Sequence, residues 1–248
     1  MKIGKLILCV LILILIQRLR MEAQTSTNGG EVVVGDGTAK TNPALAIDQS
    51  GNYVVVYLKN TSPFSLQFQR YDNEGNVIGA ETQISNTGLD VNNEHNVTML
   101  PDGKFVVVWV REISSSDQDI YFRIYDEFGA AVTSETEVQV SSNFERLPQV
   151  DADNSGNFVV THSDINTGAI SLNRFNSSGV AQGSTITVGN TGISVNTSIQ
   201  PHNVAVDSDG DIAVVWKDFD NNASPATTNL GNIKLARYNA SGVKQGTD

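Results

Sequence analysis

The residues of this chain that could do chemistry are aromatic and acidic side chains that follow short β-branched strands. Aromatic rings can stack on sugars, and carboxyl groups from separate strands can share the proton transfers of glycoside hydrolysis. The candidate ligand-binding residues are Tyr57, Trp109, Glu112, Trp216, Asp218 and Asp220. The three aromatic residues also fit a core interpretation, since each continues one alternating face of its strand.

A second set of carboxylates lies in turns and could bind calcium. Oxygen-bearing residues alternate before a glycine in 151–156 and 207–211, as they do in calcium loops. The candidate ligands are Asp151, Asp153, Asp207, Asp209 and Asp211. Neither turn ends in a Glu that could bind through both oxygens, and Asp with Gly also forms ordinary hairpin turns. The sequence therefore leaves calcium and a plain turn as alternatives, and indicates no other cofactor.

Motifs of known enzyme classes are absent from the sequence. It has no Gly-x-Ser-x-Gly, no His-Glu-x-x-His and no phosphate loop. A carboxylate pair for glycoside hydrolysis would have to come from separate repeats, with Glu94, Glu112 and Asp218 as candidates. His95 and His202 occupy equivalent positions, and either begin strands or form a two-imidazole metal site. We expect a protein that is not an enzyme.

One unit of about 50 residues occurs four times and positions these side chains. The turn glycines Gly51, Gly103, Gly156 and Gly210 lie 52, 53 and 54 residues apart. Each glycine precedes a β-branched strand that is apolar on both faces, at 52–57, 104–109, 157–162 and 211–216. Blade three departs from the pattern, with Thr161 and His162 where valine and an aromatic residue are expected. Such repeats predict an all-β propeller of four four-stranded blades.

The expected domain is residues 24–248, with repeats at about 42–92, 93–146, 147–199 and 200–248. Each repeat has an inner strand, the β-branched strand and a third strand ending in an aromatic residue. A fourth strand is expected at 81–84, 135–140 and 184–188, but not in the last repeat. Residues 29–35 could complete the last blade and close the ring. The alternative is that the chain is a fragment of a larger propeller.

Residues 1–23 resemble a secretory signal peptide, because two lysines precede an apolar run that is too short to span a membrane. Their removal changes the net charge from −11 to −14, since four of 16 basic and one of 27 acidic residues are lost. So acidic a surface argues against nucleic acid as a partner. The only cysteine, Cys9, lies within the leader. We expect a secreted or cell-surface protein with no membrane span in its mature chain.

The strand Gly156-Asn-Phe-Val-Val, with its relatives that end in Val-Trp, and the Arg-Tyr-Asp turn resemble tandem repeats of large bacterial secreted and cell-surface proteins. This resemblance implies export and a scaffold or binding role. The variable loops expected at 59–65, 111–118, 163–168 and 217–231 share one end of the blades. We therefore expect a non-enzymatic adhesion or binding module that presents these loops to a glycan or a protein. The alternatives are a secreted carbohydrate-active enzyme and a structural spacer of a larger surface protein.

Overall fold

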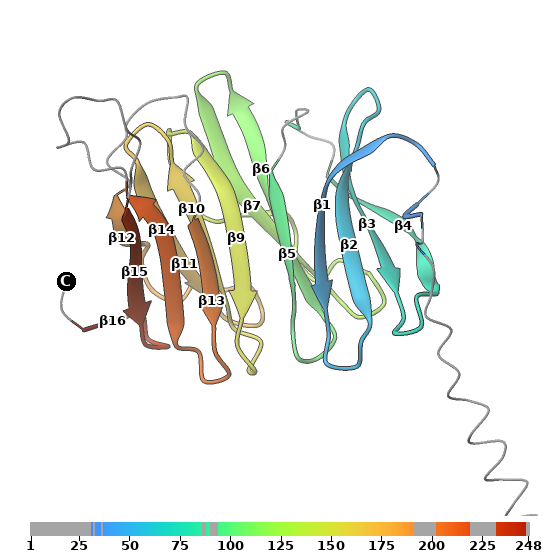
Figure 1. Cartoon of the computed structure of the whole chain (residues 1–248). Coiled ribbons are helices and arrows are strands. Elements are labelled where there is room, and N and C mark those ends of the chain that lie inside the picture. The colour runs from blue at the N-terminus through green and yellow to red at the C-terminus, as the bar shows by residue number, and fades with distance from the viewer. Residues whose placement is uncertain are drawn as a thin grey trace, which may run out of the picture.

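The computed structural model describes residues 31, 33–35, 37–85, 88–89, 94–190, 202–218 and 232–246, whose regular secondary structure is all β (Figure 1). Four antiparallel sheets, each of four consecutive strands, follow one another along the chain. The expected all-β propeller of four blades is confirmed.

Blade one contains β1 (Lys40–Ile47), β2 (Tyr53–Lys59), β3 (Ser65–Tyr71) and β4 (Val77–Ser85). Blade two contains β5 (His95–Met99), β6 (Phe105–Ser114), β7 (Asp117–Tyr125) and β8 (Thr136–Glu137). Blade three contains β9 (Glu145–Ala152), β10 (Phe158–Asp164), β11 (Ala169–Phe175) and β12 (Ile186–Asn190). Blade four contains β13 (His202–Val206), β14 (Ile212–Asp218), β15 (Asn232–Tyr238) and β16 (Lys244–Gln245).

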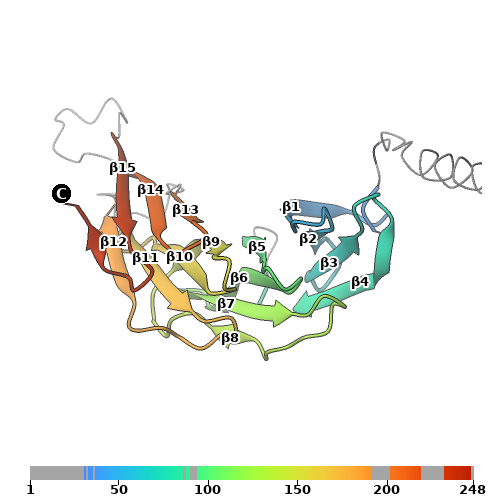
Figure 2. The same cartoon turned by 90° about the horizontal axis from the view of Figure 1, so that it is seen from below.

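The blades stand side by side in an open arc, with the first strand of each on the inner side (Figure 2). Contacts join β1 to β5, β5 to β9 and β9 to β13. We call the end of the blades with the β2–β3, β6–β7, β10–β11 and β14–β15 connections the loop end, which is uppermost in Figure 1. The opposite end, with the glycine turns, is the turn end.

Aromatic clusters fill the first two blade interfaces. Between blades one and two, the rings of Phe68, Phe105 and Tyr125 have centroids 4.9–5.2 Å apart. Between blades two and three, the rings of Phe122, Phe158 and Phe175 lie 4.8–5.3 Å apart. The interface of blades three and four uses smaller aliphatic side chains, including Leu172 and Ile212. The β-branched strands of blades two and three are apolar on both faces because each of these blades packs between two neighbours.

Backbone N–H groups that donate to an Asp or Asn side-chain oxygen stabilise most turns at the turn end. Asp48 Oδ1 accepts hydrogen bonds from the backbone N–H groups of Ser50 and Asn52, at 2.8 and 2.9 Å. Asn176 accepts the equivalent bonds from Ser178 and Val180. The turn glycine that follows takes a positive φ, +85° at Gly51, which other residues rarely adopt. These turns explain the uniform Asp/Gly spacing of the sequence.

The fourth blade differs from expectation. Its fourth strand is β16, which pairs Lys244 with Tyr238 and Gln245 with Arg237, rather than residues 29–35. Of that expected closing segment, Gly35 lies beside blade one, where an added Cβ would be 3.0 Å from the Tyr57 hydroxyl. Residues 29, 30 and 32, and the leader at 1–23, lie outside the described residues. The repeat boundaries at 42–92 and beyond stay a prediction.

Candidate functional site

A polar cluster lies between blades two and three at the loop end. Its position is set by the fifth residue of the second strand of each blade. Trp109 and Trp216 fill this position with buried indole rings in the adjacent interfaces, whereas His162 takes it in blade three. Glu145, the first residue of β9, places its Oε2 3.7 Å from His162 Nδ1, and both side chains are 1–2% exposed. A break in the repeat thus brings two titratable groups into the core.

Glu145 is a buried carboxyl group whose proton is held unusually tightly. Burial raises its pKa to about 7, because the ionised form is poorly solvated there. Hydrogen bonds from the Ser141 side chain and the Ile120 backbone lower it in part. The negative charges of Asp119 and Asp164 raise it further. Three carboxyl groups from β7, β9 and β10 therefore share one electrostatic site.

Asp119 is the second carboxyl group of this site with a raised pKa. Burial is the largest cause and takes its pKa to about 6, with Glu137 and Asp117 adding repulsion. Because Asp119 and Glu145 interact, they titrate as a coupled pair. The proton remains on Glu145 when Asp119 has lost its own. A protonated carboxyl group that interacts with an ionised one is a combination that general acid–base chemistry uses.

His162 is neutral in this site. Full burial lowers its pKa to about 3, with a further contribution from His202. A neutral imidazole beside a protonated Glu145 leaves no buried full charge between them near neutral pH, which limits the cost of burying both. His162 therefore shapes the site without supplying a positive charge.

The connection from β8 to β9 covers these groups. Gln118 N donates to the Asn143 carbonyl at 3.1 Å, and Asn143 Nδ2 donates to Asp164 Oδ2 at 2.8 Å. Ser141, in the same connection, bonds Glu145. The segment 141–144 thus lies across the carboxyl groups at the loop end.

On the inner side of the arc, Glu94 joins blades two and three beside this cluster. Its Oε1 accepts a bond from Arg146 at 2.6 Å, and its Oε2 accepts one from Leu147 N, also at 2.6 Å. Leu147 has φ +57°, a strained value for leucine, in the bulge of β9 that turns its N–H toward Glu94. The Glu94 and Arg146 side chains are 20% and 32% exposed, so this pair reaches the surface next to Glu145.

The aromatic residues expected to bind sugar lie in the blade packing. Tyr57, Trp109 and Trp216 are 2%, 0% and 6% exposed. Trp109 stacks on Tyr121 with centroids 6.3 Å apart, and the Tyr57 hydroxyl donates to Glu81 Oε1 at 2.6 Å. Trp109 and Trp216 pack in blade interfaces, and Tyr57 is covered by Lys40 and Glu81 of its own blade. Their burial agrees with the core interpretation, and sugar binding at these residues stays a prediction.

The predicted acidic residues of the loops lie apart from one another. Glu112 is exposed on β6, where its N–H bonds the Gly88 carbonyl at 2.8 Å. Asp218 ends β14 two blades away and pairs with Lys234. Asp220 lies outside the described residues. The structure therefore does not bring Glu112 and Asp218 together. The strands β6 and β7 also extend through most of the loop expected at 111–118.

Three of the five predicted calcium ligands, Asp151, Asp153 and Asp207, accept hydrogen bonds from backbone N–H groups. Asp153 accepts bonds from the N–H groups of Ser155 and Asn157, and Asp207 accepts two equivalent bonds in its own turn. Asp151 Oδ2 accepts a bond from Val206 N at 2.7 Å and so links blades three and four. Asp209 and Asp211 are exposed in the turn. Within the described ranges, no group of three His, Cys, Asp or Glu side chains is arranged to hold a metal ion. Calcium binding stays a prediction.

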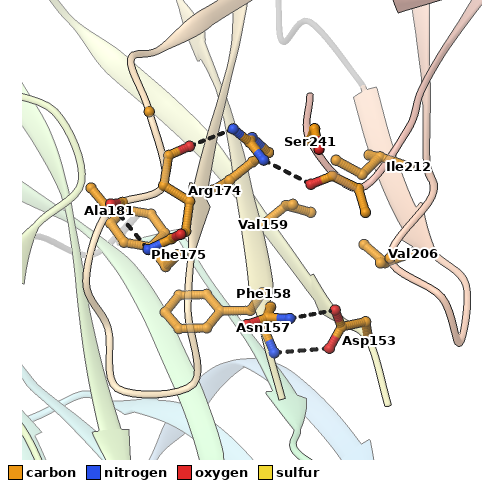
Figure 3. Close-up of a pocket in the computed structure, with 14 residues that line it drawn as sticks. Asp153, Asn157, Phe158, Val159, Arg174, Phe175, Ala181, Val206, Ile212 and Ser241 are labelled. Atoms are coloured by element: carbon orange, nitrogen blue, oxygen red, sulfur yellow. Dashed lines mark hydrogen bonds between the residues drawn. The ribbon is translucent and has the colours of Figure 1, made fainter. Parts of the chain in front are cut away.

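Figure 3 shows a cavity of about 490 Å³ between blades three and four at the turn end. Arg174 spans it, with its two terminal nitrogens donating to the carbonyls of Ala240 and Gln182 at 2.7 and 2.6 Å. Asn157 closes the lower side through two bonds to Asp153 (Figure 3). Ile212 stands here where the two preceding interfaces have phenylalanine. The cavity is therefore space left by a smaller side chain, with its polar groups largely paired to one another.

Sequence reasoning missed Asp119, Glu145 and Asp164, because a single repeat contains no motif for them. Their interaction depends on β7, β9 and β10 meeting across two blades. The sequence feature that could have indicated this site is His162, because the equivalent position in the other three repeats is an aromatic residue. Such a change can mark a place where polar partners come from the adjacent repeat.

The sequence matches no protein-family model and no curated protein. Three solved structures resemble the fold over 87% of this chain. The first is a protein of unknown function from Dyadobacter fermentans, with 13% identity and a TM-score of 0.55. The second is a subtype N10 neuraminidase-like protein from a little yellow-shouldered bat isolate, with 14% identity and a TM-score of 0.54. The third is an endo-arabinase from Bacteroides thetaiotaomicron, with 11% identity and a TM-score of 0.52. This chain spans 65%, 60% and 83% of their respective lengths, so less than two thirds of the first two. At these identities the similarity establishes the β-propeller fold alone.

The endo-arabinase overturns the expectation that the protein is not an enzyme. An enzyme shares this arrangement of blades at 11% identity, so the absence of short catalytic motifs carries no weight in this fold. In a propeller, reacting groups come from different blades and leave no contiguous motif. As to the membrane, no helix among the described residues is both long and apolar enough to cross one.

Proposed function

We propose that the protein is a carbohydrate-active enzyme that hydrolyses glycosidic bonds at the loop end of blades two and three. The observation that carries this proposal is the bridge between Gln118 and Phe144, which brings the adjacent Asp119 and Glu145 near enough to interact electrostatically. Two carboxyl groups are the minimum set for glycoside hydrolysis. The endo-arabinase and the neuraminidase-like protein of the same fold suggest a glycan as the class of substrate.

In this proposal Glu145 is the acid and Asp119 the base. The bond between the anomeric carbon and the leaving oxygen breaks, and that oxygen takes the Glu145 proton. The oxygen of a water molecule bonds to the anomeric carbon, and its proton passes to Asp119. The pKa of Glu145, about 7, keeps the acid protonated at pH values where Asp119 is already ionised. Because Glu145 is buried, the segment 141–144 must move when the sugar binds.

We further propose that this activity is extracellular. The support is the sequence of residues 1–23, with its lysines and short apolar run, together with the acidic composition of the rest. The substrate would then be an extracellular polysaccharide or a cell-surface glycan, because an exported enzyme encounters these.

The test is hydrolysis of a panel of glycans by the full chain as the cell produces it. Arabinan, xylan and a sialyl-oligosaccharide would be supplied, and new reducing ends or released sialic acid measured. Turnover that disappears in Glu145→Gln and Asp119→Asn supports the proposal. Turnover that survives both substitutions would contradict the assignment of the site.

Glu127→Gln is the matched control, because this carboxylate is exposed at the turn end of the same blade. Its activity should equal that of the unchanged chain. Glycan binding without turnover in every protein tested would mean that hydrolysis is the wrong function, although recognition of a sugar would stand.

A further inference from the structure

Blade four exposes an apolar face that is buried in every other blade. Ile233 and Leu235 of β15 are 74% and 59% exposed. Their equivalents in blade one, Leu66 and Phe68, are fully buried against blade two, as are those of blades two and three against the next blade. We call this side of β14 and β15 the trailing face.

Blade one exposes the opposite side of its sheet. Leu45 and Ile47 of β1 are 63% and 64% exposed. The equivalents of Leu45 are Val97, Val150 and Val204, which are 5–8% exposed because the preceding blade covers them. We call this side of β1 and β2 the leading face. Within the chain, the leading faces of blades two, three and four pack on the trailing face of the blade before them.

An arginine contact marks two of the three internal interfaces. Arg70 of blade one donates to the Glu127 carbonyl in a turn of blade two, and Arg174 of blade three donates to the Ala240 carbonyl in the same turn of blade four. The turn glycine allows the approach: an added Cβ at Gly242 would lie 2.7 Å from Arg174 Nε. Arg70 is also attracted by Asp126 of that turn.

Arg237 occupies this arginine position on the trailing face of blade four and is exposed. It borders a hollow of about 400 Å³ that repeats the blade-three side of the cavity in Figure 3. The aligned lining residues are Asp207 with Asp153, Asp211 with Asn157, Ile212 with Phe158, Arg237 with Arg174 and Tyr238 with Phe175. Between blades three and four, the turn that contains Ala240 and Ser241 lines the blade-four side of the cavity. The hollow on blade four lacks that turn.

We propose that the trailing face of blade four binds the leading face of blade one in a second copy of this chain. Arg237 then donates to the carbonyl of Asn73, the equivalent of Glu127 and Ala240. Asp72 faces Arg237 with the opposite charge, as Asp126 faces Arg70. A two-fold axis makes the contact twice, so that two arcs close one ring and all four end faces are covered. The contact continues an interface that the chain already forms three times.

The test is the mass of the full chain in solution, measured by light scattering after size exclusion over a wide range of concentrations. The proposal predicts twice the mass of one chain. A single-chain mass at every concentration would overturn it, and so would an open series of larger assemblies.

Two surface variants test which faces meet. Leu235→Glu on the trailing face and Leu45→Glu on the leading face replace exposed side chains, so each should melt like the unchanged chain and run as a monomer. Mixed together, they should form a pair, because one intact contact remains between an unaltered leading face and an unaltered trailing face.

If Leu45→Glu alone still forms pairs, two trailing faces meet and the proposal is wrong. If Leu235→Glu alone still forms pairs, two leading faces meet, and the proposal is also wrong. Val180→Glu, on an exposed turn away from both faces, is the control and should leave the mass unchanged. This test does not involve the carboxyl groups of the proposed active site, so its outcome is independent of the proposed function.

Discussion

Carboxylates occur at both ends of the blades, and their pKa values are shifted in opposite directions at the two ends. At the turn end, hydrogen bonds from Asn76 and from backbone N–H groups lower the pKa of Asp72. At the loop end, burial and neighbouring charges raise the pKa of Asp119 and Glu145 to about 6 and 7. The same functional group is thus part of the scaffold where donors surround it. It is available for proton transfer where donors are few.

The turn end also shows that the charge itself is not required there. Asn176 and Asn239, in the turns after the third strands, accept the hydrogen bonds that Asp48 and Asp153 accept in the turns after the first strands. A neutral amide oxygen accepts the same backbone bonds. At the loop end an amide could not replace a carboxyl group, since it cannot release or take up a proton near neutral pH.

The largest expected effect comes from removing the proton-transfer group at the loop end. Asp119→Asn should lower kcat on a cleaved glycan by about 100-fold or more, the usual contribution of general acid–base catalysis. Asp153→Asn at the turn end should leave kcat within about twofold, because asparagine serves in equivalent turns. Steady-state hydrolysis rates of the two variants decide the matter. Equal losses would mean that the two ends do not differ in the way described.

The next largest effect is a dependence of the free energy of unfolding on pH, caused by the raised pKa of Glu145. The pKa of Glu145 is raised from 4.5 to about 7 on folding. The folded state therefore holds a proton that the unfolded chain releases, and stability falls as pH rises from about 4.5 to 7. The loss is on the order of 3 kcal/mol. Urea unfolding at several pH values measures it. Glu145→Gln should remove the share of the slope that Glu145 contributes, whereas Asp119, whose pKa is raised to about 6, contributes in the same direction and remains in the variant.

His162 acts in the opposite direction over an overlapping pH range, between about 6.5 and 3. Its pKa falls to about 3 on folding, so the unfolded chain takes up a proton below about 6.5 and stability declines toward acid. His162→Leu should reduce that acid-side decline in the same urea series. An unaltered acid limb in this variant would show that another group controls it.

A smaller effect is expected for the buried turn carboxylate. Asp153→Ala removes the acceptor of three hydrogen bonds and should lower the free energy of unfolding by about 1–3 kcal/mol. Asp153→Asn should recover most of that loss. Chemical denaturation of both variants measures the difference. A loss as large in the asparagine variant as in the alanine variant would show that charge matters at this end too.

The smallest effect is expected from calcium. Because the carboxylates of Asp153 and Asp207 already accept backbone bonds, exchanging millimolar calcium for a chelator should leave Tm unchanged within error. A clear rise of Tm with calcium would show that ion binding competes with these bonds, and the sequence prediction of a calcium site would be correct.

Much of the scaffold was predictable from local sequence. The turn glycines and the β-branched strands gave the four blades, because a turn and a strand depend on neighbours within a few residues. The fourth strand of blade four was not predicted, since Lys244–Gln245 is only two residues long and has no apolar pattern. The strand extension through Arg111 and Glu112 was missed because polar residues in a hairpin resemble a loop.

The candidate site was less predictable than the scaffold. Glu112 and Asp218 were chosen because they lie in variable loops, yet they belong to different blades and face different surroundings. Tyr57, Trp109 and Trp216 were correctly recognised as equivalent positions, and their burial agrees with the core interpretation. His162 was seen only as an irregularity of the repeat.

The sequence by itself determined the repeat, its turns and the two-sided apolar strands, because each is fixed by the chemistry of adjacent residues. The tertiary structure alone decided which carboxyl groups meet. The pKa values of Asp119 and Glu145 depend on burial between blades and on charges up to 26 residues away along the chain. Burial and electrostatic repulsion act through space, so only the packing of one blade on the next could reveal them.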